Sequence, residues 1–116
     1  MYIGSFNRSN YNRKRILVFS GDRVGTLYGR GSYFALDAKY SHNYAERKDG
    51  MTSMFVARVL VGDYTQGNSS LKVPPPKDAS DPYGRTYDST VDNMLAPTIF
   101  VTYDMGQSYP AYLIKY

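Results

Sequence analysis

Apolar residues in this 116-residue chain gather in short runs, and most of these runs have the length of a β-strand. One run from Met54 to Val61 is apolar at every position except Arg58, which is typical of a strand buried on both faces. We therefore expect this segment at the centre of a sheet. Five further strands are predicted at Ile16–Phe19, Tyr33–Ala35, Tyr87–Val91, Ile99–Tyr103 and Tyr112–Tyr116.

A single short helix is predicted between these strands. The Asp37 side chain can accept hydrogen bonds from the free amides of a first turn, so the helix is expected to begin at Ala38 and to extend to about Glu46. Lys48-Asp49-Gly50 supplies turn residues to end it, and the prolines at 74–76 force an extended crossing. A few strands with one short helix predict a single domain of the α+β class, built on a mostly antiparallel sheet.

The amino-acid composition excludes several kinds of functional site. The chain has no cysteine and one histidine, which excludes disulfides, thiolate zinc sites, a cysteine nucleophile and most histidine-based metal sites. The net charge is +4 at pH 7, but much of the excess is local, between Arg8 and Arg15. A solvated basic loop and a loop that faces a dinucleotide pyrophosphate both explain it. Nucleic-acid binding ranks last, because the Met54–Val61 strand offers only Phe55 and Arg58 as an aromatic and basic pair.

We expect neither a membrane-spanning helix nor a secretory leader in this sequence. No run approaches the roughly 18 consecutive apolar residues that a membrane-spanning helix needs. The N-terminus lacks the charged and then apolar pattern of a secretory leader. We expect an intracellular protein, cytoplasmic, nuclear or both.

The most informative segment is Tyr28-Gly-Arg-Gly-Ser-Tyr-Phe-Ala35, which Ser41 and Tyr44 follow closely. Glycines let a ligand approach the backbone where a Cβ atom would clash. Tyr33 on a strand and Tyr44 on a facing helix can sandwich a planar ring. Ser41 shares the helical face of Tyr44 and can donate a hydrogen bond to an amide carbonyl. The combination predicts a nicotinamide-binding cleft.

Other interpretations of the same residues remain open. A turn between two strands explains the glycines without a ligand, and tyrosine pairs often pack in cores. A Rossmann fingerprint does not fit, because Phe34 stands where the third glycine belongs and no long helix follows. His42 is expected to point toward solvent, away from the face of Ser41 and Tyr44.

Taken in order, the motifs of the chain resemble the C-terminal part of the PARP catalytic domain, and are most similar to the mono-ADP-ribosylating members related to the macrodomain-containing PARPs. The resemblance covers nearly the whole chain. It rests on Phe6-Asn-Arg-Ser9, Tyr28 to Ala35, Phe55 to Leu60, Gly62-Asp-Tyr64, Pro74-Pro75, Tyr87-Asp88, Ile99-Phe-Val101, Tyr109-Pro110 and Tyr112-Leu-Ile114.

The resemblance implies roles for individual residues. Tyr33 matches the tyrosine of the family's H-Y-E triad and would stack under the nicotinamide, and Tyr44 matches the tyrosine over its other face. Ser41 matches the serine that hydrogen-bonds the carboxamide, and Gly31 lies in the glycine turn beside the cleft. Ile99 stands where chain-forming members carry the catalytic glutamate. The remaining residues expected to contact NAD+ are Arg8, Ser9, Tyr28 and Ala35.

The implied activity is transfer of a single ADP-ribose from NAD+ to a protein side chain, with release of nicotinamide. Isoleucine can neither accept a hydrogen bond nor act as a base, so we expect one unit rather than a polymer. NAD+ is the expected substrate, protein acceptors are the expected partners, and no metal ion is implied. Residues 1–27 would form the donor-loop region and residues 28–116 the nicotinamide pocket and the sheet core.

The family's first strands and its H-G-T histidine are expected upstream of Phe6, and His42 does not match that motif. We therefore expect the chain to correspond to part of a catalytic domain, with its N-terminal strands missing. The alternative function is a catalytically inert module that binds NAD or ADP-ribose, or another protein, on the same fold.

Overall fold

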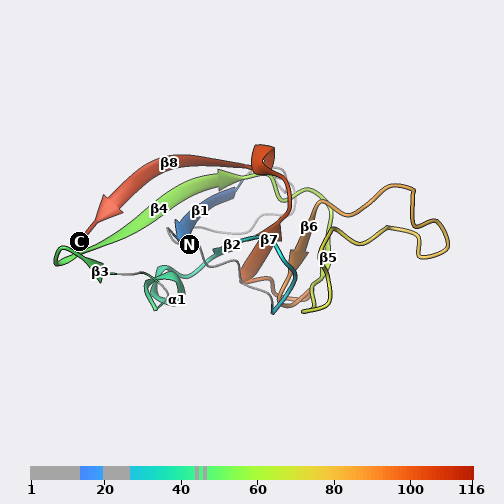
Figure 1. Ribbon diagram of the computed structural model, residues 1–116, viewed down its shortest axis with the longest axis horizontal. Helices are drawn as coiled ribbons and strands as arrows, with labels where there is room; N and C mark the ends of the chain where they lie inside the picture. Colours follow the sequence, from blue (N-terminus) through green and yellow to red (C-terminus); the bar gives the residue numbers. More distant parts are fainter. Residues whose placement is uncertain (1–13, 20–26, 44, 46) are drawn as a thin grey trace.

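The computed structural model describes residues 14–19, 27–43, 45 and 47–116, whose strands form one eight-stranded sheet (Figure 1). The strand order is β3-β4-β1-β2-β7-β6-β5, and β8 also pairs with β4. Every pairing is antiparallel except that of β5 with β6. The predicted α+β class with a mostly antiparallel sheet is confirmed. The strands are β1 Lys14–Phe19, β2 Ser32–Ala35, β3 Arg47–Lys48, β4 Met51–Val59, β5 Tyr64–Gln66, β6 Ser89–Val91, β7 Ile99–Thr102 and β8 Ser108–Lys115.

The run from Met54 to Val61, predicted as the central strand, corresponds to β4, which lies inside the sheet. Strand β4 pairs with β1 along one edge and with β8 along the other, as expected for a segment with apolar residues on both faces. It begins at Met51 rather than Met54 and ends at Val59 rather than Val61. Val61 is fully buried even though it lies beyond the strand.

The predicted helix is shorter than expected. Helix α1 spans Ala38–His42, and the Asp37 carboxylate accepts a hydrogen bond from the Lys39 amide at 2.9 Å, which confirms the predicted cap. Lys48-Asp49-Gly50 does not end this helix, because Lys48 belongs to β3. Asp49 and Gly50 form the two-residue turn to β4, with φ values of 52° and 77°. Two positive φ values are what a type I′ hairpin turn requires.

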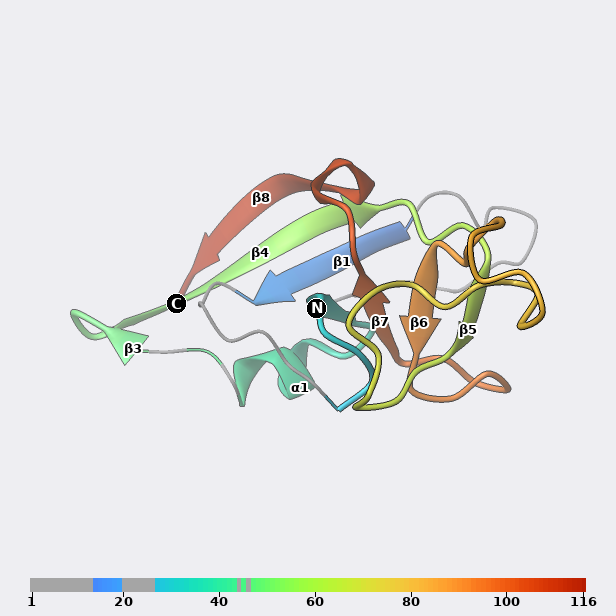
Figure 2. The ribbon, with the colours of Figure 1, turned by 45° about the vertical axis from the view of Figure 1, so that its right-hand side comes forward.

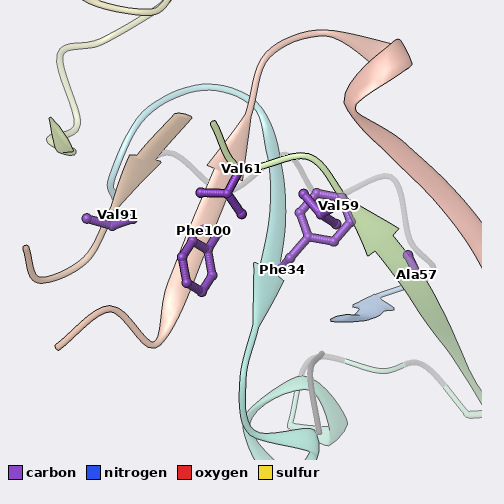
Figure 3. Close-up of a cluster of buried hydrophobic side chains, with 6 residues drawn as sticks. All are labelled: Phe34, Ala57, Val59, Val61, Val91 and Phe100. Carbon is purple, nitrogen blue, oxygen red and sulfur yellow. The ribbon is translucent and has the colours of Figure 1, made fainter. Parts of the chain in front are cut away.

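Side chains on the two faces of the sheet form two apolar clusters. Phe34 on β2 and Phe100 on β7 are fully buried in the larger cluster, with Ala57, Val59, Val61 and Val91 (Figure 3). Successive residues of a strand point to opposite faces, so Tyr33 and Ala35 lie on the other face. The smaller cluster forms there from Ala35, Met54 and Ile99, with Tyr28, Tyr33, Ala38 and Val56 packed against it.

Helix α1 lies beside β1 and β2 (Figure 2), and its residue Ala38 packs on the smaller cluster. The smaller cluster therefore lies between the sheet and the helix that carries Ser41. This arrangement places the helix next to the strand that carries Tyr33.

Residues 67–88, which connect β5 to β6, form a long arm that extends from one end of the molecule (Figure 1). Residues 75–77 and 85–87 pair at its base through backbone hydrogen bonds of 2.9 and 3.0 Å. The Lys77 ammonium forms an ion pair with the Asp63 carboxylate, which fastens the arm to the sheet. At the tip the Tyr83 side chain is 98% exposed.

Candidate functional site

Tyr33 is anchored to the turn that precedes its own strand. Its hydroxyl accepts a hydrogen bond from the Tyr28 amide at 3.1 Å and donates one to the Gly29 carbonyl. Burial raises the pKa of Tyr33 above its usual value near 10.0, so the hydroxyl is protonated at neutral pH. These two bonds fix the ring by its hydroxyl end, and the side chain packs against the smaller cluster.

The two glycines of the motif lie against β7 and the residue after it. Gly29 is buried with φ of 130°, and a Cβ atom there would lie 2.1 Å from the Tyr103 hydroxyl. A Cβ atom on Gly31 would lie 2.3 Å from the carbonyl oxygen of Thr102. Protein atoms occupy the space nearest to both glycines. The packing of the turn on the sheet thus requires glycine at both positions without any ligand, and approach of a ligand to this backbone stays a prediction.

Ile99 stands at the start of β7, directly opposite Ala35 of β2. Its side chain is 6% exposed and belongs to the same cluster as Tyr33. The Asp92 carboxylate accepts hydrogen bonds from the amides of Thr98 at 2.9 Å and of Ile99 at 3.0 Å, which fixes the entry into the strand. Ile99, which by the family resemblance stands at the position of the catalytic glutamate, is thus a rigid, apolar part of the candidate site.

Ser41 is the most unusual polar residue of the site. It lies on α1 and is 2% exposed. Among the residues that the structure describes, its Oγ atom has no hydrogen-bond partner. A buried hydroxyl without a partner typically costs about 1 to 3 kcal/mol.

The structure brings several predicted site residues together. Tyr28, Tyr33, Ala35 and Ile99 meet in the smaller cluster, and Ala38 joins it from the helix that carries Ser41. Gly31 lies directly before β2, against Thr102 of β7. The predicted contributions of Arg8, Ser9 and Tyr44 lie outside the described residues.

His42 is exposed, in agreement with the prediction that it points to solvent. The sequence analysis did not predict its partner, which is Tyr116, 74 residues away. The Nδ1 atom of His42 lies 2.5 Å from the Tyr116 hydroxyl. The two ring centroids are 5.5 Å apart. The histidine therefore ties α1 to the end of β8 and does not serve the Tyr33 cluster.

Sequence reasoning missed two residues of the site. Thr90 on β6 donates a hydrogen bond to the Tyr28 carbonyl at 2.9 Å, and the Tyr103 hydroxyl lies 2.8 Å from Thr90 Oγ1. Thr90 is 62 residues from Tyr28 in the sequence. No local motif signals such a contact, which arises only when the sheet assembles.

Within the described part of the chain, no three side chains of histidine, aspartate or glutamate are grouped closely enough to hold a metal ion. None of the helices described has both the length and the apolar character that a membrane crossing demands.

The family model of the poly(ADP-ribose) polymerase catalytic domain matches residues 12–116. Protein mono-ADP-ribosyltransferase PARP12 of Mus musculus is 50% identical over 92 residues, which cover 79% of this chain and 13% of that protein. PARP14 of Homo sapiens, another protein mono-ADP-ribosyltransferase, is 39% identical over 113 residues, or 95% of this chain and 6% of that protein. The chain thus spans only a small part of these relatives.

A solved structure shows the same fold. The crystal structure of the PARP domain of Arabidopsis RADICAL-INDUCED CELL DEATH1 superposes with a TM-score of 0.68 at 16% sequence identity. The match covers 93% of this chain and 69% of that one. Since the family model also spans nearly the whole sequence, this chain belongs to the poly(ADP-ribose) polymerase catalytic domain family.

Proposed function

We propose that this chain carries the nicotinamide side of an NAD+-dependent site that transfers a single ADP-ribose to a protein side chain and releases nicotinamide. The observation that carries the proposal is the buried Ser41 hydroxyl, which has no partner among the described residues and lies on the helix beside the Tyr33 cluster. The printed names of the relatives, which are protein mono-ADP-ribosyltransferases, support the same reaction.

Each residue would have a simple physical task. The Tyr33 ring provides a flat face for the nicotinamide, and the Ser41 hydroxyl donates a hydrogen bond to the carboxamide oxygen. Nicotinamide then departs from the ribose, and the oxocarbenium-like centre left behind is attacked by the acceptor side chain. The protein contributes orientation and electrostatic stabilisation to this step.

Ile99 limits the reaction to one unit. A carboxylate at this position would polarise a ribose hydroxyl and turn ADP-ribose itself into an acceptor. The isoleucine side chain has no polar atom, and its place in an apolar cluster leaves no room for a solvated substitute. The acceptor must then supply its own nucleophile, such as a carboxylate on the protein substrate.

A second candidate function is an inert binding module that holds nicotinamide or NAD+ without transfer. It is favoured by the position of His42, the one histidine of the chain, which bonds Tyr116 rather than approaching Tyr33. The family's H-G-T histidine therefore has no counterpart in this chain. Binding is common to both functions, and turnover separates them.

The first test is calorimetric titration of the chain with benzamide, which presents a carboxamide on a flat ring. We expect binding by the native chain and an affinity about 3- to 10-fold weaker in Ser41→Ala, the range for one lost hydrogen bond. The variant should be as stable as the native chain or more so, because a buried hydroxyl without a partner is removed.

Ser89→Ala is the matched control. Ser89 is also fully buried, but its Oγ donates to the Val61 carbonyl at 2.8 Å on the other side of the sheet. This variant should lose stability and keep its benzamide affinity. A folded native chain that does not bind benzamide, or a Ser41→Ala variant that binds it equally well, would refute the proposal. Incubation with NAD+ and an acceptor protein, followed by mass spectrometry, then separates transfer of one unit from none.

A further inference from the structure

The turn that holds Tyr33 is itself held from behind by two hydroxyl groups. Thr90 is fully buried on β6, and its Oγ1 donates to the Tyr28 carbonyl at 2.9 Å. A threonine hydroxyl has a single hydrogen, and this bond uses it. The Tyr103 hydroxyl, 2.8 Å from Thr90 Oγ1, must therefore be the donor in their contact. The hydrogen bonds run in one direction, from Tyr103 through Thr90 to the turn.

The peptide groups around Tyr28 are thus bound at both ends. The Tyr28 amide donates to the Tyr33 hydroxyl, and the Tyr28 carbonyl accepts from Thr90. The chain is also fixed two residues further on, since the Arg30 amide donates to the Leu71 carbonyl at 2.8 Å. Surface loops are usually mobile, but these hydrogen bonds leave residues 28–30 little freedom to move.

We propose that Thr90 and Tyr103, here called the hydroxyl clamp, are positioning residues of the nicotinamide site. They hold the Tyr28–Gly29 turn, and the turn holds the Tyr33 ring through both bonds of its hydroxyl. The identity of the ligand rests on the proposed function, but the clamp itself rests on these contacts.

The geometry explains why the clamp affects binding although neither of its hydroxyls needs to touch a ligand. The two bonds of the Tyr33 hydroxyl end on one short turn, so a shift of the turn releases or tilts the ring. A stacked ligand depends on the position of that ring, and small misplacements in a site are costly. The clamp connects the turn to β6 and to the residue that follows β7, so the sheet fixes the position of the Tyr33 ring.

The test compares Thr90→Val and Tyr103→Phe, which each remove one clamp hydroxyl, with Ser89→Ala. Ser89 neighbours Thr90 on the same strand and is equally buried, but its hydroxyl donates to Val61 rather than to the turn. Amide hydrogen exchange is measured by NMR at Tyr28. We expect exchange about 10-fold faster in both clamp variants and unchanged in Ser89→Ala, and benzamide affinity about 3- to 10-fold weaker in the clamp variants only.

Thr90→Ser keeps the hydroxyl and should restore both protection and affinity. If Thr90→Val does not fold, Tyr103→Phe decides, because it removes only an oxygen atom. The proposal is overturned if the Tyr28 amide exchanges at the same rate in the clamp variants and in Ser89→Ala, or if benzamide affinity falls equally in all three. Absence of benzamide binding by the native chain would refute the proposed function, whereas faster exchange at Tyr28 would still establish the clamp.

Discussion

Replacing Gly29 by alanine places a methyl group into the hydroxyl clamp. The φ angle at this position is 130°, and the new Cβ atom would lie 2.1 Å from the Tyr103 hydroxyl and 3.3 Å from Thr90 Oγ1. Neither the backbone nor the clamp can accept this without movement. Gly29→Ala therefore tests whether the turn and the clamp form one unit.

Two terms set the expected loss of stability. An alanine held at such a φ value costs about 1 to 3 kcal/mol, because the region is essentially restricted to glycine. Displacing the Tyr103 hydroxyl breaks its bond to Thr90, which adds about 1 kcal/mol. The free energy of unfolding should fall by about 2 to 4 kcal/mol in total, a large share of the roughly 5 to 15 kcal/mol typical of a domain.

Urea denaturation measures this loss, and Gly50→Ala is the control. Gly50 also has a positive φ of 77°, but no atom lies within 4 Å of its Cβ position. Its replacement should cost about 1 kcal/mol, the conformational term alone. In the Gly29→Ala background, Tyr103→Phe should cost about 1 kcal/mol less than in the native chain, since the bond is already broken. The reasoning fails if Gly29→Ala costs no more than Gly50→Ala, or if the two changes at Gly29 and Tyr103 are additive.

Two pH dependences follow from the site. Burial raises the pKa values of Tyr33 and Tyr103 above 10.0, so the stability that their neutral hydroxyls contribute is complete below pH 10 and is lost as the pH rises through the folded-state values. An ultraviolet titration should show these two phenols ionising above their usual pKa, together with loss of near-ultraviolet circular dichroism. Ionisation at pH 10 in an intact fold would contradict it. For Asp92, burial raises the pKa, but the hydrogen bonds from Thr98 and Ile99 outweigh this and lower it below 3.8. The resulting stability is present above pH 3.8 and disappears as the pH falls through the folded-state value, so Asp92→Asn should flatten the acid limb of the stability curve, and an unchanged limb would argue against this role.

Much of the sheet was predictable from local pattern. The run from Met54 to Val61 identified β4 because this strand contributes side chains to the apolar clusters on both faces of the sheet. The segments Tyr33–Ala35 and Ile99–Tyr103 located β2 and β7 to within a residue. Asp37 marked the start of α1 because its carboxylate serves the first turn. These features depend on residues close together in the sequence.

The features that were missed depend on residues far apart. Strand β3 has two residues and β5 has three, too few for a periodic pattern, and β5 forms the parallel pair with β6. The hydroxyl clamp joins residues 28 and 90, and only the assembled sheet brings them together. Of the candidate site, the structure brings Tyr33 and Ile99 into one cluster and buries Ser41 on the neighbouring helix. The binding roles expected for these three residues, like those of Arg8, Ser9 and Tyr44, remain predictions.

The arm between β5 and β6 offers a place to attach a reporter. Residues 75–77 and 85–87 run side by side at its base, so the chain leaves and re-enters the fold at nearly the same point. The Lys77–Asp63 ion pair lies at that base, while the almost fully exposed Tyr83 lies at the tip. Exposed tips with closed bases tolerate insertion well. The chain contains no cysteine, so a single cysteine introduced at Tyr83 would give one unique attachment point for a dye, which makes this domain ready for fluorescence assays of its complexes.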